Sequence, residues 1–129
     1  MTFPLSTDEL RQLIKNAVDS TFSSVEKYEH TQVEDWNRTI ISTILRSLID
    51  STTTGEGESK VPAYKYIANS TIIQHLESPA QAASGGRRGM HSAQAAFWNS
   101  EKDGTYSYKW EDGEKIGVDV VISVSWIGL

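Results

Sequence analysis

Three histidines, the side chains best suited to acid–base catalysis or metal binding near neutral pH, are scattered along the chain. They are His30, His75 and His91, and no two of them have the spacing with which a helix presents a pair of metal ligands. The chain has no cysteine, which excludes disulfides, thiolate metal sites and a thiol nucleophile. We therefore expect no bound metal and no cofactor, and we interpret the histidines as ordinary surface or strand residues.

The other candidates for catalysis also lack the arrangement that the chemistry needs. The glycine-rich run at residues 85–89 has no Lys-Ser/Thr pair and no helical pattern after it, so it does not match a phosphate-binding loop. Serines are numerous, but none lies in a Gly-x-Ser-x-Gly turn. Acidic residues fall in loops or beside turns, and their spacing singles out no acid–base pair. The sequence favours a protein that is not an enzyme.

Length and charge narrow the class of protein further. With 129 residues the chain has the size of one domain, and we expect a single domain over residues 1–129. A net charge of −5 argues against nucleic acid and against anionic membrane surfaces as partners, because both need concentrated positive charge. No apolar run approaches the roughly 20 residues of a spanning helix, and residues 1–5 do not resemble a signal peptide. These features predict an intracellular protein without membrane insertion.

Two amphipathic helices are expected in the first half of the chain. Residues 7–25 repeat apolar side chains at intervals of three and four, and Ser6 and Glu9 have the spacing of a capping box. A second apolar stripe runs from Val33 to about residue 49, and Thr31 and Glu34 repeat the capping spacing. Residues 51–60 contain no large apolar side chain, so we expect a solvated loop there.

The second half of the chain has the patterns of strands. Strands are expected at residues 64–75, 90–98, 105–110 and 116–126, where aromatic and β-branched residues are frequent or alternate with other residues. Two helices followed by four sequential strands predict an α+β fold, with both N-terminal helices packed on one face of a four-stranded antiparallel sheet.

The expected strand at residues 90–98 differs from the other three. Ser92, Ala93, Ala95 and Ala96 each bury little apolar area, so packing within the chain holds this strand weakly. It also lies between a loop at 77–89 and a turn at 99–104, both long for a simple hairpin. A strand of this kind can pair with a second chain.

Several short sequences in a characteristic order resemble the Tctex-type dynein light chains. The resemblance covers about residues 10–129 and includes Phe97-Trp98-Asn99-Ser100, Asp103-Gly104 and Lys109-Trp110-Glu111 near the ends of the expected strands. The other matching fragments are Val33-Glu34-Asp35-Trp36-Asn37, Tyr64-Lys65-Tyr66-Ile67, Ile72-Ile73-Gln74, His91-Ser92-Ala93 and residues 120–129. Two loops, 51–63 and 77–89, are longer than expected for this family.

This resemblance implies a homodimeric adaptor in the cytoplasm, associated with dynein on the microtubule cytoskeleton. It implies that residues 90–98 cross to complete the partner's sheet, and that an extended segment of the dynein intermediate chain or of a cargo protein adds beside them as a further strand. Main-chain hydrogen bonds would supply the affinity of such strand addition. The implied partner-binding strand consists of His91, Ser92, Ala93, Gln94, Ala95, Ala96, Phe97 and Trp98.

Arg87 and Arg88 are the only adjacent basic pair in this acidic chain. Two interpretations stay open: a solvated loop, or rim charges that attract acidic residues at one end of a docked segment. Two alternatives to the dynein subunit also stay open. One is a dimerisation or cargo adaptor on the same fold that acts without dynein, and the other is a small α+β enzyme or ligand-binding protein.

Overall fold

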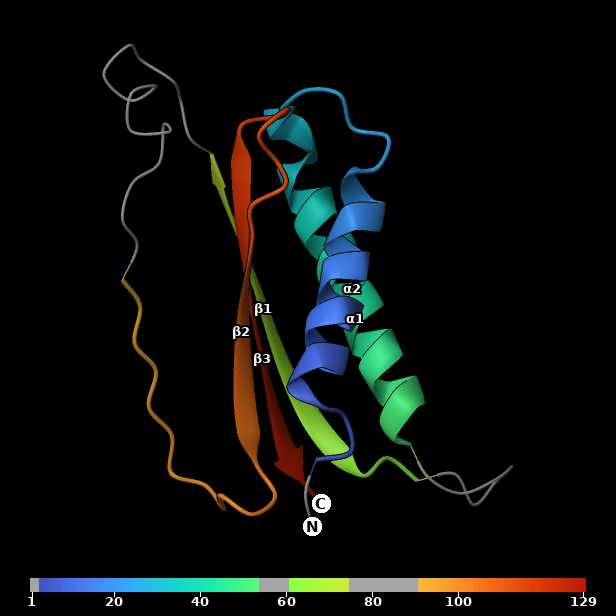
Figure 1. Cartoon of the computed structure of the whole chain (residues 1–129), viewed down its shortest axis with the longest axis vertical. Coiled ribbons are helices and arrows are strands. Elements are labelled where there is room, and N and C mark those ends of the chain that lie inside the picture. Colours follow the sequence, from blue (N-terminus) through green and yellow to red (C-terminus); the bar gives the residue numbers. More distant parts are fainter. Residues whose placement is uncertain (1–2, 54–60, 75–90) are drawn as a thin grey trace.

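Two helices lie side by side on one face of an antiparallel sheet, and an extended segment lies on the other side of that sheet (Figure 1). The computed structural model describes residues 3–53, 61–74 and 91–129. The helices are α1 (Thr7–Phe22) and α2 (Val33–Thr52), and a 3₁₀ turn, η1 (His30–Gln32), precedes α2. The strands are β1 (Tyr64–Gln74), β2 (Gly104–Trp110) and β3 (Val118–Gly128).

The start of α1 confirms the predicted cap at Ser6. The Glu9 amide donates to Ser6 Oγ at 3.2 Å, which satisfies one of the free N–H groups of the first turn. The helix ends at Phe22, earlier than the predicted Val25, whose amide donates to the Phe22 carbonyl in a tight turn. Along its length α1 buries Leu10, Ile14, Ala17, Val18 and Phe22.

The predicted cap of the second helix is wrong. The Gln32 amide donates to the Glu29 carbonyl at 2.9 Å, so Thr31 lies inside the 3₁₀ turn and not at the extended position that an N-cap needs. Helix α2 begins one residue after Gln32, without a side-chain cap. Its buried stripe still follows the predicted period and consists of Trp36, Ile40, Ile44, Leu48 and Thr52.

The sheet has the order β1-β3-β2, and both pairs are antiparallel. Strand β3 is central: Val124 faces Ala68 of β1 on one side and Tyr106 of β2 on the other. It begins at Val118 and not at the predicted Ile116, because Gly117 adopts a positive φ of 72° and ends a turn there. Side chains alternate between the two faces of each strand.

The core lies between the helices and the inner face of the sheet. Val118, Val120, Ile122 and Val124 of β3 are completely buried against the helices. Tyr106, Tyr108 and Trp110 of β2 face the same way, as their alternation predicts. Trp110 is 3% exposed and stacks on Phe22 of α1. The core thus joins α1, α2 and all three strands.

The α+β class, the two helices and the antiparallel sheet agree with the prediction, whereas the number of strands differs. The described residues form three strands, and residues 91–99 pair with none of them. The expected fourth strand is therefore not formed by the described part of a single chain. Neither helix in the described residues is long and apolar enough to cross a membrane.

Candidate partner-binding segment and groove

The residues predicted to bind a partner form one extended segment outside the sheet. His91 to Phe97 are all exposed, and Trp98 is partly buried. Figure 1 shows this segment running beside the sheet, on the side opposite the helices. Phe97 is 107% exposed, as accessible as in an isolated extended peptide. The structure thus places the predicted site residues together, with their side chains and backbone open to another molecule.

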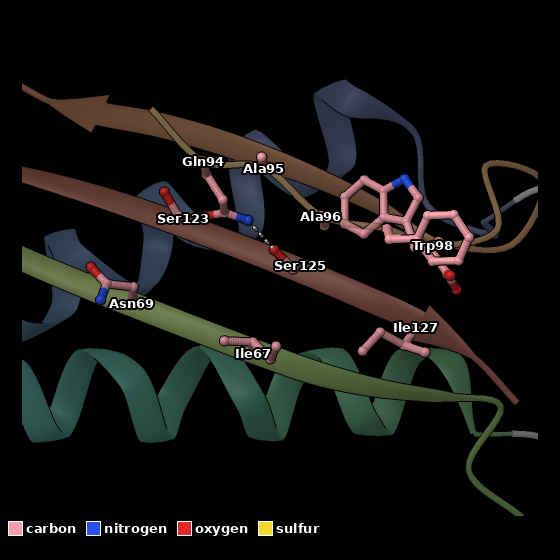
Figure 2. A pocket seen from close by; sticks show the side chains of 11 residues that line it. Ile67, Asn69, Gln94, Ala95, Ala96, Trp98, Ser123, Ser125 and Ile127 are labelled. Carbon is pink, nitrogen blue, oxygen red and sulfur yellow. Dashed lines mark hydrogen bonds between the residues drawn. The ribbon is translucent and has the colours of Figure 1, made fainter. Parts of the chain in front are cut away.

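A groove of about 460 Å³ separates this segment from the outer face of the sheet. Gln94, Ala95, Ala96 and Trp98 form one wall, and residues of β1 and β3 form the other (Figure 2). The residues from β1 and β3 are Ile67, Asn69, Ser123, Ser125 and Ile127. One weak hydrogen bond crosses the groove, from Gln94 Nε2 to Ser125 Oγ at 3.5 Å. The segment is therefore loosely held against its own sheet.

Hydroxyl groups line the outer face of the sheet between β2 and β3. Ser107 Oγ and Ser123 Oγ are 3.0 Å apart, and Ser125 Oγ donates to Thr105 Oγ1 at 3.1 Å. Thr105 Oγ1 in turn donates to the Val124 carbonyl at 3.2 Å. Because these polar side chains are short, they project little from the sheet, and another chain can approach its outer face closely. The sequence analysis missed this surface, although Ser and Thr alternate with the core residues at 105–107 and 123–125.

Most residues that line the groove are apolar or neutral. Asp103 is the single ionisable group among them, and both of its carboxylate oxygens accept backbone hydrogen bonds, from Asn99 and from Gly128. Away from the groove, burial raises the pKa of Tyr66 and of Tyr108. The described part of the chain also brings together no cluster of His, Asp and Glu that could hold a metal ion. Such a lining is suited to binding a polypeptide.

Two of the predicted site residues cannot be placed. Arg87 and Arg88 lie outside the described residues, so their role as rim charges stays a prediction.

The sequence model of the Tctex-1 family matches residues 4–127, nearly the whole chain. The chain belongs to the Tctex-1 family. This membership confirms the resemblance deduced from the order of short sequences.

Several named proteins are similar to this chain over most of their length. A protein of Schizosaccharomyces pombe named dynein light chain Tctex-type is 33% identical over 129 residues, which is 100% of both chains. A protein of the same name from Dictyostelium discoideum is 30% identical over 109 residues, 84% of this chain and 81% of its own. A protein of Zygosaccharomyces rouxii, named topoisomerase I damage affected protein 2, is 30% identical over 124 residues, 96% of this chain and 87% of its own.

Proposed function

We propose that this protein is a non-catalytic, homodimeric light chain of the dynein motor that acts in the cytoplasm on the microtubule cytoskeleton. In this proposal, residues 91–98 of each copy complete the sheet of the other copy. An extended segment of the dynein intermediate chain, or of a cargo protein, then adds beside the exchanged strand. The observation that carries the proposal is the extended, unpaired segment in a chain whose relatives are named dynein light chains.

Backbone groups that have no partner among the described residues support the exchange of this segment. Strand β2 lies at the edge of the sheet and pairs with β3 alone, so its other edge faces no described strand. The backbone of residues 91–98 makes no hydrogen bond to another described residue. Pairing the segment of one copy with β2 of the other would satisfy both sets of donors and acceptors.

The exposure of Phe97 supports the same arrangement. Burial of a fully exposed phenylalanine side chain contributes roughly 2–3 kcal/mol of favourable free energy. Its neighbours Ala95 and Ala96 also present apolar atoms, and Ile67 on the outer face of β1 is 61% exposed. A second copy that enters the groove would cover these side chains together with the outer face of β2 and β3, which is lined by hydroxyl groups. The dimer is thus the arrangement that buries the exposed apolar surface of the groove.

Small side chains suit the strand addition of a peptide. Ser92, Ala93, Ala95 and Ala96 allow another backbone to lie close, so main-chain hydrogen bonds can form along the segment. A twofold dimer would present two equivalent edges of this kind. A partner with two binding segments would therefore gain effective concentration from the second contact.

Proline substitutions at neighbouring positions test the proposal. Successive N–H groups of a strand point to opposite edges, so one edge of the exchanged strand would face β2 of the partner copy and the other the peptide. Of the variants Ala95→Pro and Ala96→Pro, we expect one to weaken the dimer and the other to weaken peptide binding at least tenfold with the dimer intact. Ala95→Ser and Ala96→Ser, which keep the N–H groups, are the matched controls.

Dimerisation would be measured by sedimentation and binding by calorimetry with synthetic peptides that span the dynein intermediate chain of the same organism. A wild-type chain that stays a folded monomer at about 100 µM, above the micromolar range of many specific complexes, would contradict the dimer. Unchanged peptide affinity in both proline variants would place the peptide site elsewhere.

A dynein-independent adaptor on the same fold is the second candidate function. One observation favours it: the Zygosaccharomyces rouxii relative carries a name that does not mention dynein. Purification of the tagged protein from its own cells distinguishes the two, since dynein heavy and intermediate chains accompany only a dynein subunit.

A further inference from the structure

The link between the exposed segment and β2 is a tightly hydrogen-bonded turn at residues 99–103. The Asn99 carbonyl accepts hydrogen bonds from the amides of Lys102 at 3.0 Å and Asp103 at 2.8 Å. Asn99 Oδ1 accepts a third one, from the Glu101 amide at 3.0 Å. Asn99 therefore fixes the path of the backbone through this turn.

Asp103 ties the turn to the far end of the central strand. Its Oδ2 accepts from the Asn99 amide at 2.8 Å, and its Oδ1 accepts from the Gly128 amide at 2.8 Å. A charged acceptor makes such bonds stronger than neutral ones. One carboxylate thus connects the first residue after the exposed segment to the last residue of β3.

This connection lies at the point where the segment leaves the sheet. A link of this length could close a hairpin, in which residues 91–98 would pair with β2 of their own chain. The structure instead directs them over the outer face, where Trp98 and Ile127 both line the groove (Figure 2). Among the described residues no strand lies beside the outer edge of β2, and residues 91–98 are extended.

We propose that Asp103 is the positioning residue of a rigid hinge that holds residues 91–98 away from their own β2 and ready to pair with a second copy. This inference rests on the proposed dimer. Because the hinge is ordered before association, a dimer would form without the entropic cost of fixing the link. Loosening the hinge would weaken the dimer, and it would permit the closed hairpin as a competing state.

Two substitutions loosen the hinge in different ways. Asp103→Asn leaves one acceptor oxygen for two amide donors, and Asn99→Ala removes the acceptor for the Glu101 amide. Glu101→Gln is the matched control, because it removes a negative charge from the same turn and leaves these hydrogen bonds in place. The measurements are the dimer dissociation constant, by sedimentation equilibrium, and hydrogen exchange of individual amides.

We expect Asp103→Asn to raise the dissociation constant about tenfold or more, Asn99→Ala to raise it by a smaller factor, and Glu101→Gln to change it less than about twofold. The Asn99 and Gly128 amides should be protected from exchange in the wild type and in Glu101→Gln, and should lose protection in Asp103→Asn. If Asp103 served only to stabilise the fold, Asp103→Asn would lower the free energy of unfolding and leave the dimer dissociation constant unchanged.

The outcomes separate this proposal from the proposed function. A wild-type dimer whose dissociation constant is unchanged in both hinge variants overturns the hinge and leaves the dimeric adaptor standing. A wild-type chain that is always monomeric overturns both. If Asp103→Asn fails to fold, the exposed Asn99→Ala substitution and the exchange of the wild-type amides still decide the matter.

Discussion

Asp19 of helix α1 accepts two hydrogen bonds, one from Lys15 of the same helix and one from Trp110 of the edge strand β2. Its Oδ1 accepts from Trp110 Nε1 at 2.8 Å, and its Oδ2 accepts from Lys15 Nζ at 2.7 Å. Burial by itself raises the pKa of this carboxyl, but the hydrogen bonds from Lys15 and Trp110 outweigh it, so the pKa lies below its ordinary value of 3.8. The ionised carboxylate therefore stabilises the fold above that value, and its contribution is lost as the pH falls through the lower, folded-state pKa.

Substitutions of Asp19 test this link. Asp19→Ala leaves the indole N–H of the buried Trp110 without its acceptor and should lower the free energy of unfolding by about 1–2 kcal/mol. Asp19→Asn should cost less, because the amide oxygen can still accept from Trp110. Urea unfolding at pH 7 and one fixed protein concentration gives both values. Equal losses in the two variants would contradict the role of the indole hydrogen bond.

The same two proteins give a pH dependence. The difference in unfolding free energy between the wild type and Asp19→Asn should narrow as the pH is lowered from about 5 toward 2, where the carboxyl of the folded protein takes up a proton. A difference that stays constant over this range would contradict the lowered pKa.

At the level of the elements, the segment before α1 (residues 3–6, called the N-terminal arm below) packs against the ends of two strands through Phe3. Phe3 stacks on Trp126, near the end of β3, with ring centroids 4.2 Å apart, and meets Tyr64, the first residue of β1, edge-on at 5.0 Å. Aromatic pairs of this geometry contribute beyond the area that they bury.

Truncation of this ring should loosen the arm. We expect Phe3→Ala to lower the free energy of unfolding by about 1–2 kcal/mol and Phe3→Leu to lower it by about half as much. Pro4 is a neighbouring exposed residue, and Pro4→Ala should change the free energy of unfolding by less than about 0.5 kcal/mol. Urea unfolding followed by tryptophan fluorescence measures all three, and a Phe3→Ala variant as stable as Pro4→Ala would show that the arm does not contribute.

The elements with one buried face could be predicted from the sequence, since burial imposes a period on the residues. The stripe in α2 and the alternation of Tyr106, Tyr108 and Trp110 are of this kind, and both face the core. The cap at Thr31 was predicted wrongly, because the spacing of two residues cannot show that a 3₁₀ turn precedes the helix in the chain. The link from Asp103 to Gly128 was missed because it joins residues far apart in the sequence.

Residues 90–98 show a different limit of sequence reasoning. Their pattern is compatible with a strand, yet residues 91–99 pair with no strand of the described chain. Whether a strand forms depends on the edge available to it, and in our account that edge belongs to a second copy. Periodicity along one chain cannot reveal this, although the small side chains and the long flanking connections point to it.

At the scale of the whole molecule, one chain is an incomplete unit in this account. In the part of the chain that the structure describes, the helices and the central strand form a closed core, while the outer face, the edge of β2 and the extended segment remain open. Exchange of the segment between two copies would close all three at once and make stability depend on protein concentration. The peptide-binding edge would exist only in the dimer, which ties partner binding to assembly.

The most direct test of this account is disulfide cross-linking between the segment and β2. The chain contains no cysteine, so introduced pairs are the only thiols present. Ser107→Cys, on the exposed outer face of β2, would be combined in turn with Gln94→Cys, Ala95→Cys and Ala96→Cys, because directly opposed residues on neighbouring strands come close enough to form a disulfide.

The oxidised products are then separated by mass under denaturing conditions. We expect at least one pair to give a dimer joined by disulfides between copies, which reverts to single chains on reduction. The single variant Ser107→Cys should give much less disulfide-joined dimer under the same oxidising conditions. Disulfides that form only within single chains would show that the segment folds back on its own β2, and would contradict the exchanged dimer.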